Sequence, residues 1–233
     1  IHEQNAIPGL SNKLLSLVAK KIFTGFKTNL KNSQIIGNPI RENLYNIPGP
    51  KQRFKNKRGP LNILIFGGSL GAKQFNELIP SVLSNVSKSK NINVIHQSGE
   101  SYYGLLCKKY KQYKVNAKPI KYIHDMKKNY AWADIVISRS GALTVTELAE
   151  IGIASILIPY PYAVDNHQYF NAKVLSSKNG GKIILEDNIK IELEKYILSL
   201  TRDKCLNIAC CAKVKNRQEA NKKIYEYLKD YEK

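Results

Sequence analysis

The strongest constraint on the fold is an alternation of two patterns. From residue 61 onward, short apolar runs alternate with segments whose apolar residues recur at helical spacing. The runs are LNILIFGG, INVIHQSG, PIKYI, ADIVISRSG, IASILIPYP and GKIILED, and a helical pattern follows each of them. Continuous apolar runs of this length suit strands that are buried on both faces. The sequence therefore predicts an α/β fold with a parallel, doubly wound sheet of about six strands.

Three polar or glycine-rich segments follow strands of this predicted sheet. They are GGSLGA at 67–72, SRSGALTVTEL at 138–148 and DNHQYFNA at 165–172. Ligands of doubly wound sheets bind outside the carboxyl ends of the strands, where loops meet the N-termini of helices. We therefore expect a binding site at this edge of the sheet.

The segment at 67–72 places glycines between a strand and a helix. Gly67, Gly68 and Gly71 would let the backbone approach a ligand closely, and the N–H groups of the following helix favour an anion such as phosphate. Ser69 belongs to the same turn. Glycine turns of this kind also occur without a ligand, so both interpretations stay open. The dinucleotide-binding and P-loop spacings are not met, which disfavours nicotinamide enzymes and ATPases.

Glu147 lies three residues after Thr144, near the start of a predicted helix. The helix dipole favours a carboxylate there. One interpretation is a capping interaction worth about 1 kcal/mol. The other is that Glu147 accepts two hydroxyl groups of a ribose while the helix N-terminus faces phosphate. Spacing alone does not decide between the two.

Asp165, Asn166, His167 and Gln168 gather just before another predicted helix. Side chains that bind hydroxyl groups, placed at the carboxyl end of a strand, suit a sugar. An ordinary polar helix start would look the same. Three such loops at one sheet edge favour the binding interpretation.

Charge is the clearest feature of the composition. The chain has 37 Lys and Arg against 18 Asp and Glu, a net charge of +19. Such an excess attracts nucleic acid, anionic lipid headgroups or phosphorylated substrates. Because the excess is mostly lysine in a chain that is also rich in Asn and Ile, compositional bias is the simpler explanation. The clearest basic cluster lies at 51–58, in a stretch bounded by Pro and Gly that we interpret as a linker.

No apolar run approaches the roughly 20 residues of a membrane-spanning helix, and nothing resembles a signal peptide. Cys107, Cys205, Cys210 and Cys211 lack paired C-x-x-C spacing, and three of them fall inside one predicted helical stretch. We interpret them as buried or idle thiols of a reducing compartment, rather than as a metal site or a disulfide scaffold. The protein should therefore stay in the cytoplasm.

The chain opens on IHEQNAIPGL, whose polar residues and Pro-Gly turn are typical of a loop at the end of a strand. No strand precedes it, so we expect the chain to be a piece of a longer protein. Ser11 or Asn12 should then cap a helix whose apolar face contains Leu14, Leu15, Val18 and Ile22. The runs KIFTGF and SQIIGNP read as strands of a domain whose beginning is missing, and the last helical stretches begin at Ile189.

Seven motifs in order carry a family resemblance. They are HEQNAIPG, GNPIR, GGSLGA, YIHDM, YAWAD, SRSGALTVTEL and DNHQYFNA. From residue 1 to about 175 the chain resembles the MurG family, the glycosyltransferases that make lipid II in peptidoglycan synthesis. The resemblance implies a GT-B architecture, in which two Rossmann-like domains face each other across a cleft. It also implies inverting transfer of N-acetylglucosamine from UDP-N-acetylglucosamine to the 4-hydroxyl of the muramoyl sugar in lipid I, with no metal and no cofactor.

The resemblance assigns the donor contacts residue by residue. They would be Asn5, Arg41, Ser69, Ile123, Ala142, Leu143, Thr144, Val145, Thr146, Glu147 and Gln168. Tyr122, next to Ile123, should cap the uracil, and backbone groups of Ile123 should meet the uracil edge. Glu147 would take the ribose hydroxyls and Gln168 the sugar. Ser69, the glycine turn and Arg41 would stabilise the departing diphosphate.

The family's N-terminal glycine-rich loop, which supplies a candidate general-base histidine, has no counterpart in this sequence. Most of the acceptor domain and its membrane-facing patch also lack counterparts. His2 and Glu3 are the local acid–base candidates, and we interpret them as positioning residues rather than as the base. We accordingly expect this chain alone to bind the donor without transferring sugar.

The implied domains and partners complete the prediction. We expect an acceptor-domain remnant at 1–39, a linker at 40–60, a donor-binding domain at 61–215 and a C-terminal helix at 216–233 that packs back on the first domain. The implied partners are UDP-N-acetylglucosamine, lipid I and the cytoplasmic face of an anionic bacterial plasma membrane, bound peripherally, and no nucleic acid. Two alternatives remain: a GT-B enzyme for another UDP-sugar, or a non-enzymatic basic domain that binds polyanions.

Overall fold

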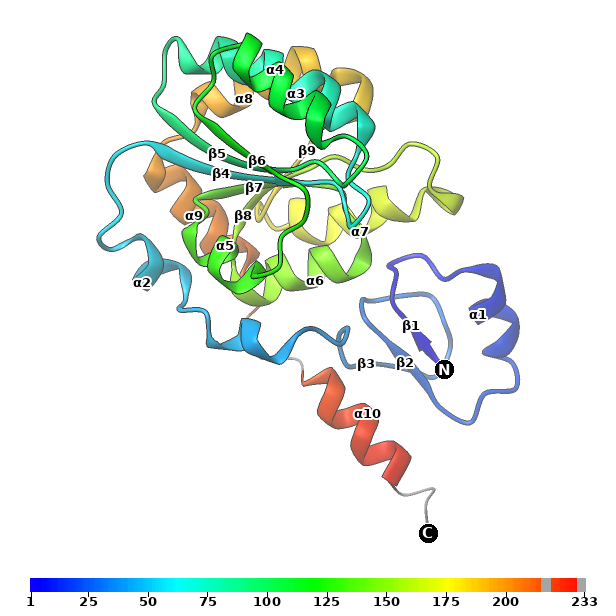
Figure 1. Ribbon diagram of the computed structural model, residues 1–233. Helices are drawn as coiled ribbons and strands as arrows, with labels where there is room; N and C mark the ends of the chain where they lie inside the picture. Colours follow the sequence, from blue (N-terminus) through cyan, green and yellow to red (C-terminus); the bar gives the residue numbers. More distant parts are fainter. Residues whose placement is uncertain (215–218, 230–233) are drawn as a thin grey trace.

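The computed structural model describes residues 1–214 and 219–229. A large α/β unit lies beside a small unit formed by the start of the chain (Figure 1). The small unit contains β1 (His2–Glu3), α1 (Leu10–Leu15), β2 (Ile22–Thr24) and β3 (Ser33–Ile35), with its strands parallel in the order β1-β2-β3. The segment that joins the units contains η1 (Glu42–Asn46) and α2 (Pro50–Phe54).

The large unit is built on a parallel sheet. Its strands are β4 (Leu61–Phe66), β5 (Ile92–Gln97), β6 (Ala117–Ile120), β7 (Ile135–Ser138), β8 (Ala154–Leu157) and β9 (Lys182–Ile183). They lie in the order β6-β5-β4-β7-β8-β9, and each neighbouring pair is parallel. The predicted doubly wound sheet is confirmed. The order reverses between β4 and β7, where a crevice opens in such folds.

Helices cover both faces of this sheet (Figure 1). On one side lie α3 (Lys73–Ser87), α4 (Tyr103–Gln112) and α8 (Glu194–Ser199), and on the other lie α5 (Met126–Trp132), α6 (Ala142–Ile151) and α7 (His167–Ser176). The short helical segment η2 (Val164–Asn166) precedes α7, and η3 (Glu186–Asn188) and η4 (Ile189–Leu193) precede α8. Helix α9 (Arg202–Ala212) follows α8. Alternate residues of β4 enter opposite cores: Ile63 and Ile65 face α3, whereas Leu64 and Phe66 face α6. This explains why the strand is continuously apolar.

The basic stretch at 51–58 lies in the segment that joins the two units, and some of its cations bind the large unit. Arg53 of α2 is buried and donates hydrogen bonds to the carbonyl oxygens of Pro48 and of Ile151 at the end of α6. Lys57 contacts Asp134 at 3.0 Å, and Arg202 of α9 contacts the same fully buried carboxylate at 3.0 Å. Two of the five clustered cations thus point inward and fasten the segment to the large unit, which the polar sequence did not indicate.

The prediction for the first helix was wrong in part. Helix α1 ends at Leu15, its N-cap is Gly9 rather than Ser11 or Asn12, and Ile22 belongs to β2. Asn12 instead donates to the carboxylate of Glu3 at 2.8 Å. The expected apolar face is exposed. Its residues and their neighbours are Leu10, Leu14, Leu15, Leu17 and Val18, which we call the α1 patch.

Helix α10 (Ala220–Lys229) packs against the small unit. Ala220 forms a cluster with Phe23 and Ile36, and the rings of Phe23 and Tyr227 meet edge to face with centroids 5.4 Å apart. The predicted boundary between 215 and 216 falls outside the described residues, and the domain limits remain a prediction. In the described part of the chain, no helix has both the length and the apolar character to cross a membrane.

Candidate functional site

A cavity opens at the carboxyl ends of β4 and β7, where the strand order reverses. It holds about 790 Å³ of space, open solvent included. Its lining residues are Pro39, Ile40, Arg41, Phe66, Gly68, Ser69, Gln97, Tyr122, Ile123, Met126, Leu143, Thr144 and Glu147. A wider groove continues from Gly68, Ser69 and Thr144 toward Tyr160 and Gln168. We call these the inner cavity and the outer groove; together they gather most of the predicted site residues.

Glu147 is buried at the wall of the inner cavity, with 8% of its surface exposed. Its carboxylate accepts a hydrogen bond of 2.8 Å from the hydroxyl of Tyr130, a fully buried residue of α5. Burial raises the pKa of Glu147, while the Tyr130 hydrogen bond and the charge of Arg41 oppose that shift. The residue is therefore a positioned acceptor rather than a helix cap. Tyr130 was not predicted, because its sequence context shows only a helical aromatic residue.

The N-terminus of α6 lies at this site, because Leu143 and Thr144 line the inner cavity and Gly141 lines the outer groove. Its N-cap is Gly141, which lacks a side chain that could occupy the first amides of the helix. Within the predicted segment 142–147, Leu143, Thr144 and Glu147 line the inner cavity. Ala142 and Val145 are buried in the core, and Thr146 accepts a hydrogen bond of 2.9 Å from Asn38. The sequence did not separate these two groups.

The glycines of the β4–α3 turn have different tasks. A Cβ on Gly71 would lie 1.9 Å from the carbonyl oxygen of Ser98, and one on Gly99 would lie 2.0 Å from that of Leu70. These two glycines, with φ of +79° and +78°, let the turn pack against the β5–α4 turn. Gly68 also has positive φ, +96°, but a Cβ there would meet no atom of the described residues within 4 Å. Gly68 is thus the glycine that faces open space.

Ile123 and Tyr122 lie opposite this turn. Tyr122 is 47% exposed and lines the inner cavity, where a planar base could stack on it. The amide of Ile123 is already engaged, because it donates to Oε1 of Gln97 at 3.0 Å. Of the Ile123 backbone groups that were expected to meet the uracil, only the carbonyl oxygen is therefore not used by Gln97 in this structure. Gln97 was not predicted, since it ends a strand as one polar residue among several.

Gln168 lies in the first turn of α7 and lines the outer groove. Its Oε1 accepts a hydrogen bond of 3.0 Å from the amide of Tyr160, and its carbonyl oxygen accepts one of 2.8 Å from Ser140. Arg139 lies between the rings of Phe75 and Tyr160, at 4.7 and 5.3 Å, and pairs with Glu186. Arg139 therefore shapes the groove wall.

The HEQN segment meets the large unit beside α7. Asn5 Oδ1 accepts a hydrogen bond of 3.0 Å from Asn171, whose own Oδ1 accepts one of 2.8 Å from the amide of Ala6. Glu3, 2% exposed, accepts hydrogen bonds from the amides of Asn5 and Gly9. His2 Nε2 lies 2.9 Å from the carbonyl oxygen of Gly37. These contacts organise the loop and join it to α7, one turn from Gln168.

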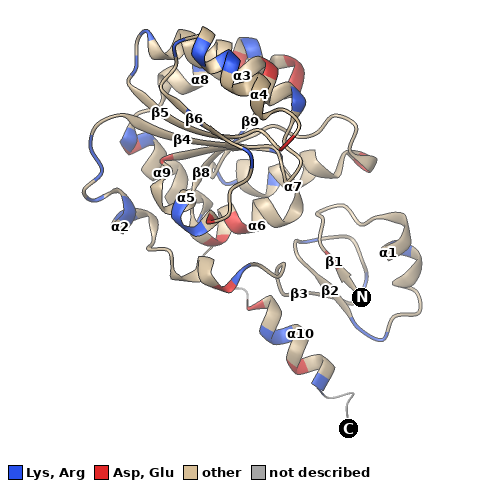
Figure 2. Cartoon of the chain, in the orientation of Figure 1, with Lys and Arg blue, Asp and Glu red and all other residues tan. Residues whose placement is uncertain are grey.

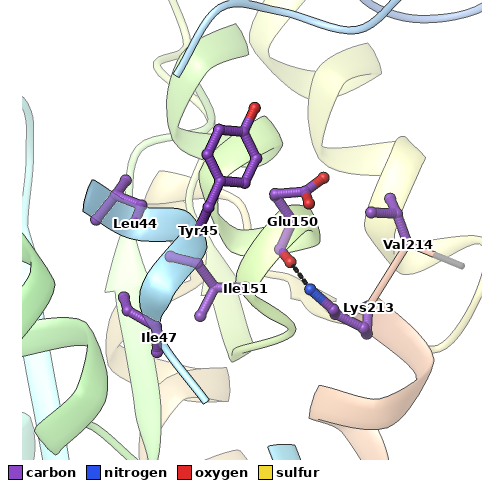
Figure 3. A pocket seen from close by; sticks show the side chains of 7 residues that line it. All are labelled: Leu44, Tyr45, Ile47, Glu150, Ile151, Lys213 and Val214. Carbon is purple, nitrogen blue, oxygen red and sulfur yellow. Dashed lines mark hydrogen bonds between the residues drawn. The ribbon is translucent and has the colours of Figure 1, made fainter. Parts of the chain in front are cut away.

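A third cavity lies away from this edge, between η1 and the C-terminal end of α6 (Figure 3). Leu44, Ile47 and Ile151 line it, and Lys213 donates to the carbonyl oxygen of Glu150 there. This cavity is remote from the strand ends. The four cysteines are free thiols, and the described residues contain no group of three or more His, Cys, Asp or Glu that could hold a metal ion.

Comparison with known proteins identifies the family. The family model "Glycosyltransferase family 28 C-terminal domain" matches residues 62–227, which is more than half of the chain. The chain belongs to glycosyltransferase family 28. The resemblance found in the sequence and the GT-B fold are thereby confirmed.

Two relatives of this family 28 chain carry the same name. The "UDP-N-acetylglucosamine--N-acetylmuramyl-(pentapeptide) pyrophosphoryl-undecaprenol N-acetylglucosamine transferase" of Coxiella burnetii (strain Dugway 5J108-111) is 40% identical over 99% of this chain. The protein of that name from Buchnera aphidicola subsp. Schizaphis graminum is 43% identical over 99% of the chain. The chain spans 66% and 65% of the length of these two relatives.

A solved structure agrees with this assignment. The crystal structure of Acinetobacter baumannii MurG superposes with a TM-score of 0.80 at 35% identity, covering 91% of this chain and 60% of that one. The likeness extends over most of the elements described above. The family 28 chain therefore has the MurG fold over nearly its whole length.

Proposed function

We propose that this chain forms the donor site of an enzyme that transfers N-acetylglucosamine from UDP-N-acetylglucosamine to lipid I, giving lipid II. The observation that carries the proposal is the inner cavity, which brings Ile123, Glu147 and the N-terminus of α6 around one space. A base, a ribose and a phosphate each need one of these groups. The names of the relatives support the donor and the acceptor.

Each part of the donor has a matching group. Tyr122 would stack on the uracil, and Glu147 would accept hydrogen bonds from the ribose hydroxyls. The α6 amides would hold the diphosphate, because unpaired N–H groups and the helix dipole both favour an anion. The sugar would extend into the outer groove, where Gln168 would donate from the amide nitrogen that Tyr160 does not use.

The chemistry would be a single displacement with inversion. The 4-hydroxyl oxygen of the acceptor would attack the anomeric carbon while the bond to the diphosphate breaks and UDP leaves. The hydroxyl proton would pass to a general base, a role that the resemblance gives to a histidine of the family's N-terminal glycine-rich loop. Negative charge then grows on the diphosphate, where Ser69, Arg41 and the α6 amides would stabilise it electrostatically. His2 and Glu3 would position the HEQN loop, because both already bind backbone or side-chain groups of the small unit.

The small unit supports a proposal about the membrane. The α1 patch exposes Leu14 by 60%, Leu17 by 82% and Val18 by 80%, beside Lys13 and Lys20. Apolar side chains flanked by lysines suit an interface with anionic lipid. We propose peripheral binding to the cytoplasmic face of the plasma membrane through this patch. Leu17→Glu should reduce sedimentation with phosphatidylglycerol vesicles, whereas Leu105→Glu on α4 should not.

Among the described residues, Lys and Arg occur on several elements, including α2, α3, α4, α5 and α10 (Figure 2). This distribution gives little support to a dedicated polyanion groove and favours the donor-site proposal.

A donor panel tests the proposed function. Isothermal titration with UDP-N-acetylglucosamine, UDP-glucose and UDP should show binding of all three, with the N-acetylated sugar bound most tightly. Tighter binding of UDP-glucose would indicate a GT-B enzyme for another sugar. Absence of binding to every uridine nucleotide would overturn the proposal.

A further inference from the structure

Gln97 connects the two halves of the inner cavity. It is the last residue of β5, the strand that lies between β4 and β6, and it is registered with Phe66 on one side and Ile120 on the other. The glycine turn follows Phe66, and the loop of Tyr122 and Ile123 follows Ile120. Gln97 therefore lies midway between the groups that would hold the phosphate and the groups that would hold the base.

Both ends of its side-chain amide are used. Nε2 donates to the carbonyl oxygen of Gly68 at 2.7 Å, and Oε1 accepts from the amide of Ile123 at 3.0 Å. One orientation of the amide group satisfies both contacts, because a carbonyl oxygen needs a donor and an N–H needs an acceptor. Gln97 is 3% exposed and Ile123 is also 3% exposed, so water competes little with the bond between them, whereas Gly68 is exposed.

Backbone contacts support the same connection. The amide of Ser98 donates to Ile120 at 2.9 Å, and the amide of Gly99 donates to Lys121 at 3.2 Å. Gly71 and Gly99 pack against each other on the other side. Displacing Gln97 would leave the buried amide of Ile123 and the buried side-chain amide of Gln97 itself without partners, which is unfavourable, whereas the exposed Gly68 carbonyl would keep the Gly71 amide at 3.0 Å.

We propose that Gln97 is a positioning residue that sets the base preference of the site, an inference that rests on the proposed uridine nucleotide. With the Ile123 amide held by Gln97, the carbonyl oxygen of Ile123 is the backbone group that meets the base. A carbonyl oxygen accepts a hydrogen bond from N3–H of uracil. It repels N3 of cytosine, which carries a lone pair and no proton.

Two substitutions separate the two bonds. Gln97→Met keeps the length of the side chain and removes both hydrogen bonds. Gln97→Glu keeps an acceptor for the Ile123 amide and places an oxygen against the Gly68 carbonyl. Gln52→Met, at an exposed position of α2, is the matched control for a Gln-to-Met change.

Titration of each variant with UDP and CDP gives the first test. We expect Gln97→Met to weaken UDP binding about tenfold, the effect of one or two hydrogen bonds, and to bring the UDP and CDP affinities together. Gln97→Glu should weaken the binding of both nucleotides and keep the preference for UDP. Gln52→Met should match the parent chain. Tighter UDP binding by Gln97→Met would overturn the proposal, because it would show that Gln97 occupies the place of the base. An unchanged ratio of the two affinities would also overturn it.

Hydrogen exchange of the Ile123 amide gives a test that needs no nucleotide. The amide should be protected in the parent chain and in Gln97→Glu, and its exchange should be at least about tenfold faster in Gln97→Met. Equal protection in all three would refute the positioning role, even if the chain bound no uridine nucleotide and the proposed function had failed separately. Protection that persists on addition of UDP is the expected result; its loss would mean that the base displaces Gln97.

Discussion

Replacing Glu147 by alanine tests the ribose contact directly. The side chain lies at the wall of the inner cavity, 8% exposed, and its carboxylate is held by Tyr130 at 2.8 Å. A hydrogen bond to a charged group contributes about 1.5 to 3 kcal/mol. Glu147→Ala should therefore weaken UDP binding by that amount, which is roughly ten- to 150-fold in Kd.

Two controls keep this result specific. Tyr130→Phe removes the hydroxyl that holds Glu147 but keeps the carboxylate, so it should weaken UDP binding by less than Glu147→Ala does. The nucleotide 2′-deoxy-UDP lacks one of the two ribose hydroxyls. Glu147→Ala should therefore reduce its binding free energy by about half as much as that of UDP. Isothermal titration measures the binding of UDP and 2′-deoxy-UDP to the parent chain and to both variants. A folded Glu147→Ala variant with unchanged Kd for UDP would refute the assignment.

The pH dependence follows from the same carboxylate. Burial raises the pKa of Glu147 above its ordinary 4.5, so the carboxylate takes up its proton at a higher pH in the folded chain than in the unfolded chain. UDP affinity should thus fall as the pH is lowered through this raised pKa, since the neutral acid is the poorer acceptor. The Tyr130 hydrogen bond lowers the pKa, so Tyr130→Phe should move the fall to higher pH. The opposite displacement would contradict the geometry. The raised pKa also affects the stability of the fold. Glu147 stabilises the folded state at pH values below its pKa in the unfolded chain, and this contribution is lost as the pH rises through its pKa in the folded chain.

Three further substitutions test the rest of the structure. Asp134→Asn should lower the free energy of unfolding in urea by about 3 to 5 kcal/mol, because two cations lose a fully buried partner; a loss under about 1 kcal/mol would contradict this. Gly71→Ala should be more destabilising than Gly68→Ala, since both incur about 1 to 3 kcal/mol of backbone strain but the first also meets the Ser98 carbonyl at 1.9 Å; equal losses would count against the loop packing. Gln168→Ala should weaken the binding of UDP-N-acetylglucosamine and leave the affinity for UDP nearly unchanged. Equal losses of affinity for both ligands would contradict the assignment of Gln168 to the sugar.

The sheet was predictable because each strand is a continuous apolar run closed by a polar or glycine-rich turn. Residues such as Ile63 and Leu64 are buried on opposite faces, and that double burial leaves a clear record in the sequence. The expected place of the site followed from the same pattern, because the carboxyl ends of parallel strands lie at one edge of the sheet. Glu147 could be narrowed to two roles by its place in the helix, and the structure shows it bonded to Tyr130.

Other features depended on contacts between distant residues. Gln97 and Tyr130 act through partners 26 and 17 positions away, so no local pattern marks them. The α1 patch has helical spacing, which ordinarily predicts a buried face, yet its leucines are exposed. The cations at 51–58 were interpreted as part of a linker, and no local pattern showed that Arg53 and Lys57 bind carbonyl or carboxylate groups of the large unit.

The central claim is that the inner cavity recognises a uridine nucleotide rather than charge alone. The most direct measurement is a pair of titrations of this chain, one with UDP and one with a DNA oligomer, at low and high salt. We expect saturable UDP binding that changes little with salt, and weak DNA binding that salt abolishes. Tight, salt-sensitive DNA binding without any preference for UDP would contradict the account.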